Sequence, residues 1–340
     1  MWKRLSAQKI GIDLGTTNTL VFVAGKGVVL NEPTVVAVNR VTKKIEAIGI
    51  EAKDMLGKTP DSIVVYRPMQ DGAIADYQIT YAMLRYFLSK ALGKNSLFKP
   101  NVLVSVPAGI NSTERRAVIE ATMKAGAKSA VIVKEAILAA IGAGVPINDA
   151  TGCMIIDSGG GTTDVAVISL GGIVASTSVK CGGNKLDQAI IDYVKRTYNV
   201  AIGDQTAEEV KKTLAAALPI TPDVKGSVKG RDVVSGLPIT LSISTNELVK
   251  AIDYELKLII KAIKTVLEQT PPELASDIID NGIVMTGGTA SLAHLPALIE
   301  QQTGIKVKVA DDPAYAVVRG TGVLLQHLDD YKRSITAKRS

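Results

Sequence analysis

Two segments of the sequence share one pattern, and this repeat restricts the possible folds more than any other feature. Ile10–Gly25 reads IGIDLGTTNTLVFVAG, and Met154–Ser169 reads MIIDSGGGTTDVAVIS. Each has an apolar strand ending at an aspartate, a turn of small residues and a strand rich in β-branched residues, which is typical of a β-hairpin. Asp13 and Asp157 are separated by about the length of a domain. The repeat therefore predicts a duplication, with two similar halves facing each other across a cleft.

The segments around the hairpins alternate between strand and helix patterns, which predicts an α/β fold. Capping boxes at Asn111–Glu114, Thr206–Glu209 and Ser244–Glu247 predict three helix starts. We expect strands at 102–107, 130–133 and 283–285. Helices are expected from the Asn111 cap to about residue 125 and at 185–198, 206–218 and 244–269, with short strands and turns at 219–238. No change in composition marks a linker, so the halves are expected to be interleaved.

Composition excludes several classes of protein. A chain of 340 residues with 46% hydrophobic residues can fill two cores, so intrinsic disorder is excluded. Cys153, Cys181, His294 and His327 are too few for a disulfide framework or a zinc site, which favours a reducing cytosol. No run of about 18 apolar residues occurs, and no apolar segment follows the basic start, so we expect neither a membrane span nor a secretory signal.

The net charge of +6 would suit a nucleic acid, an anionic membrane or a nucleotide as partner. Aromatic residues make up only 4% of the chain and do not alternate with basic ones, unlike in proteins that stack single-stranded bases. We therefore expect no nucleic-acid partner.

The turns of the two hairpins suit a phosphate group. Glycine-rich turns let backbone N–H groups approach a phosphate closely, and threonine hydroxyls add further donors. Asp13 and Asp157 would hold a hydrated Mg²⁺, and a third turn at Gly287 and Gly288 would lie nearby. A single glycine-rich turn is more often only a turn, so the prediction depends on the three together. Leu56–Thr59 ends like a Walker A loop but lacks its first glycine, which excludes a P-loop NTPase.

The strings IDLGTTNT, IIDSGGGTTD and VMTGGTA resemble the actin, Hsp70 and sugar-kinase superfamily. Longer segments resemble the family of the bacterial actin homologue MreB, from Ile10 to about Leu328. These segments are VLNEPTVVAV (Val29–Val38), YRPMQDGAIADY (Tyr66–Tyr77), SLFKPNVLVSVPAGINSTERRAV (Ser96–Val118), GGGTTDVAVISLGGIV (Gly159–Val174) and GDQTAEEVKK (Gly203–Lys212). Such colinear similarity is more specific than any one glycine motif.

The resemblance implies an actin-like ATPase fold, with two duplicated α/β domains around a nucleotide cleft, each carrying a smaller subdomain. Domain I would span 1–145, with 312–340 returning to it, and domain II would span 146–311. It also implies a slow ATPase that binds ATP and Mg²⁺, polymerises into membrane-associated filaments and guides cell-wall synthesis to set rod cell shape. Its partners would be further copies of itself, an anionic membrane surface and the cell-wall elongation machinery.

The resemblance also assigns site residues. Glu135 and Thr162 would position the attacking water, with Asp157 as the third catalytic residue, and Asp13 and Asp157 would hold Mg²⁺ through water. The expected nucleotide-binding residues are Asp13, Gly15, Thr16, Thr17, Asn18, Gly159, Gly160, Gly161, Thr162, Gly183, Asn184, Glu208, Lys211, Lys212, Gly287, Gly288, Thr289 and Ala290.

Three positions depart from the family pattern. Lys134 and Ala136 flank Glu135 where Glu-Glu-Pro-Met is usual, Asn184 replaces an aspartate, and Thr289 replaces a glycine. We expect nucleotide binding to survive these changes, which bear instead on the rate of hydrolysis.

Two apolar segments are candidate membrane contacts. Leu97 and Phe98 lie in a basic, turn-rich segment that resembles the membrane-inserting loop of the family, and Trp2 and Leu5 flank two cations. A filament would repeat these weak contacts and so increase its avidity. The expected location is cytoplasmic, peripheral at the inner face of the cell membrane. The segments 42–58 and 219–238 are candidate surfaces for head-to-tail contact.

Other functions on the same fold stay open at this point. A small-molecule kinase would need a general-base aspartate facing an acceptor pocket. An Hsp70-like chaperone ATPase would need a peptide-binding domain, and we expect none after Ser340. A plasmid-segregating or organelle-aligning bacterial actin would share the ATP site without needing Trp2 or the Leu97–Phe98 pair.

Overall fold

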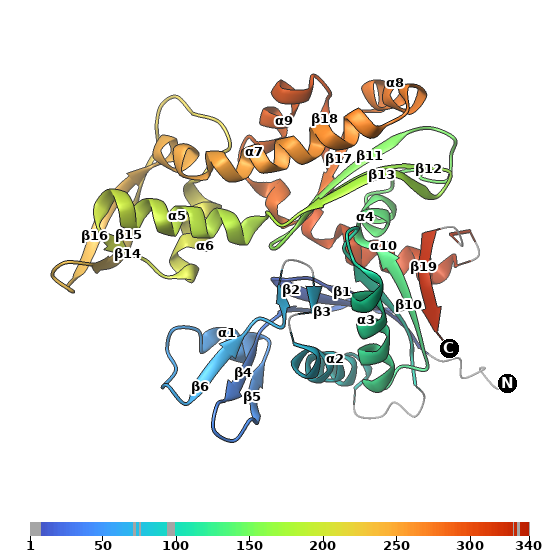
Figure 1. Cartoon of the computed structure of the whole chain (residues 1–340), viewed down its shortest axis with the longest axis horizontal. Coiled ribbons are helices and arrows are strands. Elements are labelled where there is room, and N and C mark those ends of the chain that lie inside the picture. Colours follow the sequence, from blue (N-terminus) through green and yellow to red (C-terminus); the bar gives the residue numbers. More distant parts are fainter. Residues whose placement is uncertain are drawn as a thin grey trace.

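A computed structural model describes residues 8–70, 73–74, 76–93, 99–328, 330–331 and 334–339. The chain forms two main β-sheets, one in the lower half of Figure 1 and one in the upper half, with helices packed against both. The lower sheet has the order β19-β10-β9-β1-β2-β3 and the upper sheet the order β13-β12-β11-β17-β18.

The strands of the lower sheet are β1 (Lys9–Leu14), β2 (Asn18–Val23), β3 (Gly27–Pro33), β9 (Asn101–Val106), β10 (Ser129–Lys134) and β19 (Ile335–Arg339). Those of the upper sheet are β11 (Cys153–Ser158), β12 (Thr163–Ser169), β13 (Gly172–Val179), β17 (Ile283–Thr286) and β18 (Val307–Val309).

The two main sheets repeat one topology. In the lower sheet β1 pairs antiparallel with β2 and parallel with β9, and in the upper sheet β11 pairs antiparallel with β12 and parallel with β17. The hairpins β1–β2 and β11–β12 therefore occupy equivalent places, as the repeated sequence pattern predicted. The two predicted aspartates each lie one residue before the end of a central strand of their sheet.

A smaller lobe extends from each half on the left of Figure 1. The lower one contains β4 (Val36–Asn39), β5 (Ile45–Ile48), β6 (Ile63–Tyr66) and α1 (Ile50–Asp54), and the upper one contains α5 (Gly183–Tyr198), β14 (Val200–Ala201), α6 (Asp204–Leu214), β15 (Lys225–Asp232) and β16 (Pro238–Ser244). The remaining elements are β7 (Met69–Gln70), β8 (Ala73–Ile74), α2 (Tyr77–Leu92), α3 (Ser112–Lys124), α7 (Thr245–Gln269), α8 (Pro272–Asn281), η1 (Gly288–Ser291), α9 (Leu295–Thr303) and η2 (Pro313–Tyr315).

Two helices pack against each other where the halves meet, α4 (Glu135–Gly142) and α10 (Ala316–Gln326). Glycines allow their close approach, because a Cβ on Gly142 would lie 1.8 Å from the Ala316 carbonyl oxygen. A Cβ on Gly320 would lie 1.9 Å from the Leu138 carbonyl oxygen. The predicted domain boundaries, at 145/146 and 311/312, lie just after α4 and just before η2. The division into two domains at these residues stays a prediction.

Two of the three predicted capping boxes form. Asn111 caps α3 and Ser244 caps α7, each with the reciprocal glutamate bond. The Thr206–Glu209 prediction was wrong, because α6 begins earlier, at Asp204, after Gly203 and without a side-chain cap. It also ends at Leu214 rather than at about residue 218. Buried Ala207 and Val210 fix the register of this helix against the core, which a local capping motif does not override.

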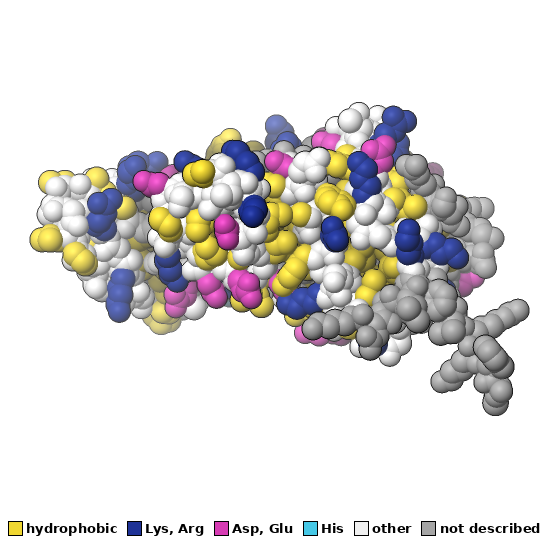
Figure 2. Space-filling view, turned by 90° about the horizontal axis from the view of Figure 1, so that it is seen from below, with side chains coloured by type: hydrophobic (Ala, Val, Ile, Leu, Met, Phe, Trp, Pro, Cys, Tyr) yellow, Lys and Arg dark blue, Asp and Glu magenta, His cyan; other side chains and the backbone are white. Residues whose placement is uncertain are grey.

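The segment predicted to hold short strands and turns at 219–238 contains β15, which pairs with β16 in one longer hairpin. Among the described residues no helix has both the length and the apolar character needed to cross a membrane. On the face shown in Figure 2, lysine and arginine side chains are scattered among hydrophobic and acidic ones.

Candidate nucleotide site

A cavity of about 840 Å³ lies between the halves and their small lobes. Its volume falls in the range usual for small-molecule and cofactor sites. The predicted residues among its lining are Asp13, Gly15, Thr16, Thr17, Asn18, Glu135, Asp157, Gly159, Gly160, Gly161, Thr162, Gly183, Asn184, Glu208, Lys211, Lys212, Gly287, Gly288 and Thr289. Ala290 is the exception, because it is 3% exposed and packs in the hydrophobic core of the upper half.

Asp13 is held at the end of the first hairpin by a serine from the neighbouring parallel strand. The Ser105 hydroxyl donates a hydrogen bond of 2.8 Å to Asp13 Oδ1 and accepts one of 3.2 Å from the Leu14 N–H. Burial raises the pKa of Asp13 to about 6, against the opposing effect of the Ser105 bond. The carboxyl group is thus fixed in place, and a nearby cation would stabilise its ionised form.

Asp157 is held in the same way at the end of the second hairpin. The Thr286 hydroxyl, on the parallel neighbour β17, donates a bond of 2.8 Å to Asp157 Oδ1. Burial raises the pKa of Asp157 to about 7, and the charges of Asp13 and Asp164 add to this while the Thr286 bond opposes it. Two aspartates thus line one cavity, each oriented by a hydroxyl from the next strand.

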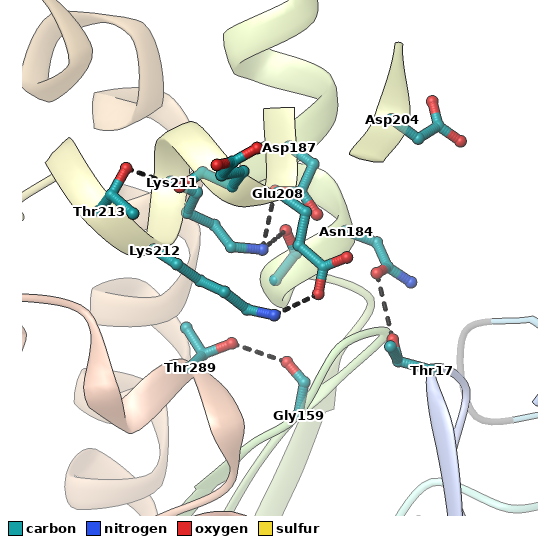
Figure 3. A network of polar contacts seen from close by, with 12 residues as sticks. Thr17, Gly159, Asn184, Asp187, Asp204, Glu208, Lys211, Lys212, Thr213 and Thr289 are labelled. Atoms are coloured by element: carbon teal, nitrogen blue, oxygen red, sulfur yellow. Dashed lines mark hydrogen bonds and ion pairs between the residues drawn. The ribbon is translucent and has the colours of Figure 1, made fainter. Parts of the chain in front are cut away.

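The turns of the two hairpins interlock at the floor of the cavity. A Cβ on Gly160 would lie 1.8 Å from Thr17 Oγ1, and one on Gly161 would lie 2.5 Å from Thr16 Oγ1. Thr17 Oγ1 also donates a bond of 3.1 Å to Asn184 Oδ1, at the start of α5 (Figure 3). Glycine at these places is required by close approach rather than by backbone conformation, since neither has a positive φ.

Glu135 and Thr162, the predicted water-positioning pair, are both buried in the cavity wall. Burial raises the pKa of Glu135 well above its ordinary value, and the charges of Asp164, Asp13 and Asp157 raise it further. Glu135 therefore faces a group of buried carboxyls and tends to hold a proton when no cation is nearby.

One side of the cavity is formed by α6. Lys212 Nζ lies 2.5 Å from Glu208 Oε1, and Lys53 of the lower lobe lies 3.6 Å from Glu208 Oε2. Burial would raise the pKa of Glu208, but the bond from Lys212 and the charge of Lys53 outweigh it and lower the pKa. Lys211 Nζ lies 2.8 Å from Asp187 Oδ1 and donates to the Gly183 carbonyl at 2.8 Å (Figure 3). Lys211 thus ties α6 to the start of α5.

The third turn packs against the second one. Thr289 Oγ1, in η1, donates a bond of 2.8 Å to the Gly159 carbonyl (Figure 3). The departure from glycine at this position thus supplies a hydroxyl that joins the two turns. Beyond them the cavity wall becomes mostly apolar, with Leu214, Ala216, Ile220, Val224 and Leu292.

Several residues of the site were not predicted. Ser105 lies in a segment predicted to be a strand and Thr286 directly follows another, but only the strand order shows that their hydroxyls hydrogen-bond to the two aspartates. Asp164 accepts a bond of 2.8 Å from the Ala108 N–H of the lower half and is fully buried. Nothing in the sequence marked Asp187 or Lys53 as part of the site. The predicted membrane contacts Trp2, Leu5, Leu97 and Phe98 lie outside the described residues.

Comparison with known proteins gives one consistent family. The family model described as MreB/Mbl protein matches residues 7–333. The cell shape-determining protein MreB of Escherichia coli is 46% identical over 334 residues, covering 96% of each chain. The cell shape-determining protein Mbl of Bacillus subtilis is 46% identical over 323 residues, covering 95% of this chain and 97% of its own.

Solved structures agree with this result. MreB5 of Spiroplasma citri bound to ADP superposes with a TM-score of 0.91 at 38% identity, covering 95% of this chain and 97% of its own. The MamK double helical filament superposes with a TM-score of 0.80 at 21% identity, covering 94% and 99%, and so supports the fold alone. The comparisons confirm the predicted actin-like fold and do not favour the kinase, chaperone or plasmid-segregating alternatives. The chain therefore belongs to the MreB/Mbl family.

Proposed function

We propose that this protein is a cytoskeletal ATPase that assembles into actin-like filaments at the cell membrane and helps to determine cell shape. The observation that carries this proposal is the pair Asp13 and Asp157, placed by equivalent hairpins on the wall of one cavity in a chain of the MreB/Mbl family. The relatives in solved structures were bound to ADP and to AMPPNP, and the curated relatives are named cell shape-determining proteins.

The two interlocked turns would bind the phosphates of ATP. Thr16, Thr17 and Asn18 come from the first turn, and Gly160 and Gly161 from the second, all along the cavity wall. Their backbone N–H groups and hydroxyls provide donors where the negative charge of a triphosphate needs them. The α6 side chains and the apolar far wall would then receive the ribose and the base.

The donor set fits a hydrated Mg²⁺. No group of three or more His, Cys, Asp or Glu side chains able to hold a metal occurs in the described part of the chain. Mg²⁺ usually needs only one or two carboxylates besides phosphate and water, and Asp13 and Asp157 would supply these. When bound with ATP, Mg²⁺ would neutralise charge on the phosphates and so favour ionisation of both aspartates despite their raised pKa.

Glu135 and Thr162 would hold the attacking water for slow hydrolysis. Phosphoryl transfer needs little covalent help from the protein and depends mostly on positioning and charge neutralisation. Both side chains are buried, Glu135 at the start of α4 and Thr162 in the turn just before β12. Hydrolysis at this site, coupled to assembly, is the enzymatic part of the proposal.

Filament formation at the membrane is the cellular part of the proposal. Head-to-tail contact between identical copies generates an open filament, and repetition strengthens weak surface contacts. Trp2, Leu5, Leu97 and Phe98 are the proposed membrane contacts, and an anionic inner membrane face and the cell-wall elongation machinery are the proposed partners.

Sedimentation and negative-stain microscopy, with and without Mg-ATP, test the proposal. We expect filaments only with nucleotide, and none from D157A, because that variant loses one of the two carboxylates. D253A is the matched control, since Asp253 lies on α7 in an exposed pair with Lys257 and does not line the cavity. ATP-dependent filaments from D157A would contradict the role of Asp157, and a wild-type protein that never assembles would contradict the cytoskeletal function.

Pelleting with anionic vesicles of phosphatidylglycerol tests the membrane contacts. Replacement of Trp2, Leu97 and Phe98 by serine should release the protein from these vesicles while ATP binding stays unchanged. Vesicle binding that persists in the triple variant would contradict the proposed contacts.

A further inference from the structure

A chain of hydrogen bonds leads from the segment before α10 to the first phosphate turn. Asn18 Nδ2 donates to Asn31 Oδ1 at 2.9 Å, and Asn31 Nδ2 donates to Tyr315 Oη at 2.9 Å. Asn18 begins β2, Asn31 lies on β3, and Tyr315 ends η2 and precedes α10. The three side chains thus join segments that are far apart in the sequence.

The sheet register places the two asparagines on the cavity side. Asn31 lies opposite Leu20 and Asn18 opposite Pro33, so the two asparagines are diagonal neighbours on one face of the β2–β3 pair. Asn18, Leu20 and Asn31 all line the cavity. The amide of Asn31 is fixed at both ends, because its oxygen accepts from Asn18 and its nitrogen donates to Tyr315.

The segment that carries Tyr315 is held in an uncommon conformation. Asp312 has a φ of 43° and a ψ of 62°, in the left-handed region that residues other than glycine rarely adopt. The Arg319 guanidinium donates to the Asp311 carbonyl and lies 3.6 Å from the Asp312 carboxylate. Such strain persists only where the surroundings determine the conformation, and it is found most often at functional sites.

The same segment also contacts the third turn. The Pro313 carbonyl accepts a bond of 2.9 Å from the Gly287 N–H, and Pro313 and Ala314 line the cavity. At its other end the Ala316 carbonyl packs against Gly142 of α4. Four consecutive residues therefore reach the third turn, strand β3 beside the first hairpin, and the contact between α4 and α10.

We propose that Tyr315 is a positioning residue for the triphosphate: through Asn31 it fixes Asn18 on the first phosphate turn, and through its segment it couples that turn to the Gly287 turn. This inference depends on the proposed function, because it assigns Asn18 to the phosphates. Tyr315 itself is not among the lining residues, so it acts through its neighbours. Its contribution should concern the phosphates of ATP and leave recognition of the base unchanged.

The variant Y315F tests this inference, since it removes one oxygen and keeps the ring. We expect ATP affinity, measured by fluorescence titration of a labelled ATP, to fall by about threefold to tenfold, the range expected for one hydrogen bond. The affinity for adenosine, which has no phosphates, should stay unchanged. Y254F is the matched control, because Tyr254 is 67% exposed on α7 and does not line the cavity.

A double-mutant cycle with N31A separates positioning from simple packing. If Tyr315 acts through Asn31, then Y315F should weaken ATP binding little further in the N31A background. Additive effects, unchanged ATP affinity in Y315F, or equal loss of ATP and adenosine affinity would each overturn the inference. A wild-type protein that binds no ATP would instead contradict the proposed function, so the two failures are distinguishable.

Discussion

The first and second hairpins have the same strand neighbours but different turns. Asp13 and Asp157 are each held by a hydroxyl from the adjacent parallel strand, at 2.8 Å in both cases. The first turn carries two threonines, Thr16 and Thr17, whereas the second carries three consecutive glycines. The hydroxyls of Thr16 and Thr17 occupy the space that side chains at Gly161 and Gly160 would need.

This difference shows how a duplicated element can become complementary to its own copy. The equivalent strands keep the carboxylates in equivalent places, while the turns have diverged so that one fills the space left by the other. The divergence extends into the second strand of each hairpin, where Leu20 lies opposite Asp13 but Asp164 lies opposite Asp157. The second hairpin thus has one more carboxyl than the first, and both of its carboxyls are buried.

The most direct way to break this complementarity is to add a methyl group at Gly160. G160A would place a Cβ 1.8 Å from Thr17 Oγ1, so the two turns must separate. We expect ATP affinity to fall by about 10-fold to 100-fold, in line with the usual cost of overpacking. Isothermal titration with Mg-ATP measures this change.

A second substitution and a control locate the cause. T17G in the G160A background removes the clashing side chain and should restore the free energy of unfolding towards that of T17G alone. G203A is the control, because nothing lies within 4 Å of a Cβ at Gly203. An affinity of G160A equal to that of the wild type would show that the turns are not held together.

The two aspartates should differ in how they couple stability to pH. Both have a folded pKa above the ordinary aspartate value of 3.8, about 6 for Asp13 and about 7 for Asp157. Between the ordinary and the raised pKa values, the folded protein therefore binds more protons than the unfolded chain does. Stability of the protein free of nucleotide and Mg²⁺ should therefore fall as pH rises from 5.5 to 7.5, by about 3 kcal/mol. Urea unfolding in the presence of EDTA measures this dependence.

Single substitutions turn this pH dependence into a comparison of the hairpins. D157N should remove more of it than D13N, because the pKa of Asp157 is higher, so Asp157 loses more of its proton within this pH window than Asp13 does. Equal effects, or a larger effect of D13N, would mean that the two sites are not electrostatically distinct.

The fold was predictable from the sequence wherever the signal is local. Alternating β-branched strands, small turns and two capping boxes located both hairpins, α3 and α7 within a few residues. The start of α6 was not predictable, because burial of Ala207 and Val210 decides it and the Thr206–Glu209 motif does not. Local motifs fail where tertiary packing sets the register.

The site was predictable only where its residues form part of a repeated or familiar string. Asp13, Asp157 and the glycine turns could be identified, and they line one cavity. The hydroxyls of Ser105 and Thr286 depend on strand order, and the contact of Thr17 with Gly160 depends on how two halves of the chain meet. Such relations between distant segments have no local sequence signature.

Replacing Asp164 by the residue found in the first hairpin tests the difference in the second strands. D164L resembles Leu20 in shape and leaves the Ala108 N–H without its acceptor at 2.8 Å. We expect a loss of about 1–3 kcal/mol in the free energy of unfolding, the cost of an unsatisfied buried donor. D164N is the control, because its amide oxygen can still accept the bond. Equal destabilisation by both variants would show that the bond to Ala108 is unimportant.

The smallest expected effect lies between the two small lobes, where ion pairs rather than interlocked turns join the halves. Arg67 lies 3.7 Å from Asp204, with side chains 33% and 68% exposed. Because exposed ion pairs contribute only about 0–1 kcal/mol, R67E should speed nucleotide release by no more than about fivefold. Stopped-flow displacement of a labelled nucleotide measures this rate.

The reversed pair distinguishes attraction between the two small lobes from other effects of the substitution. R67E/D204R should restore slow release, and high salt should remove the difference between R67E and the wild type, because salt screens exposed charges. K257E, which breaks an exposed ion pair on α7 away from the cavity lining, should not change the rate. If R67E released nucleotide faster than G160A, this ion pair and not the interlocked turns would hold the halves together. The complementarity of the two hairpins would then be a consequence of closure rather than its cause.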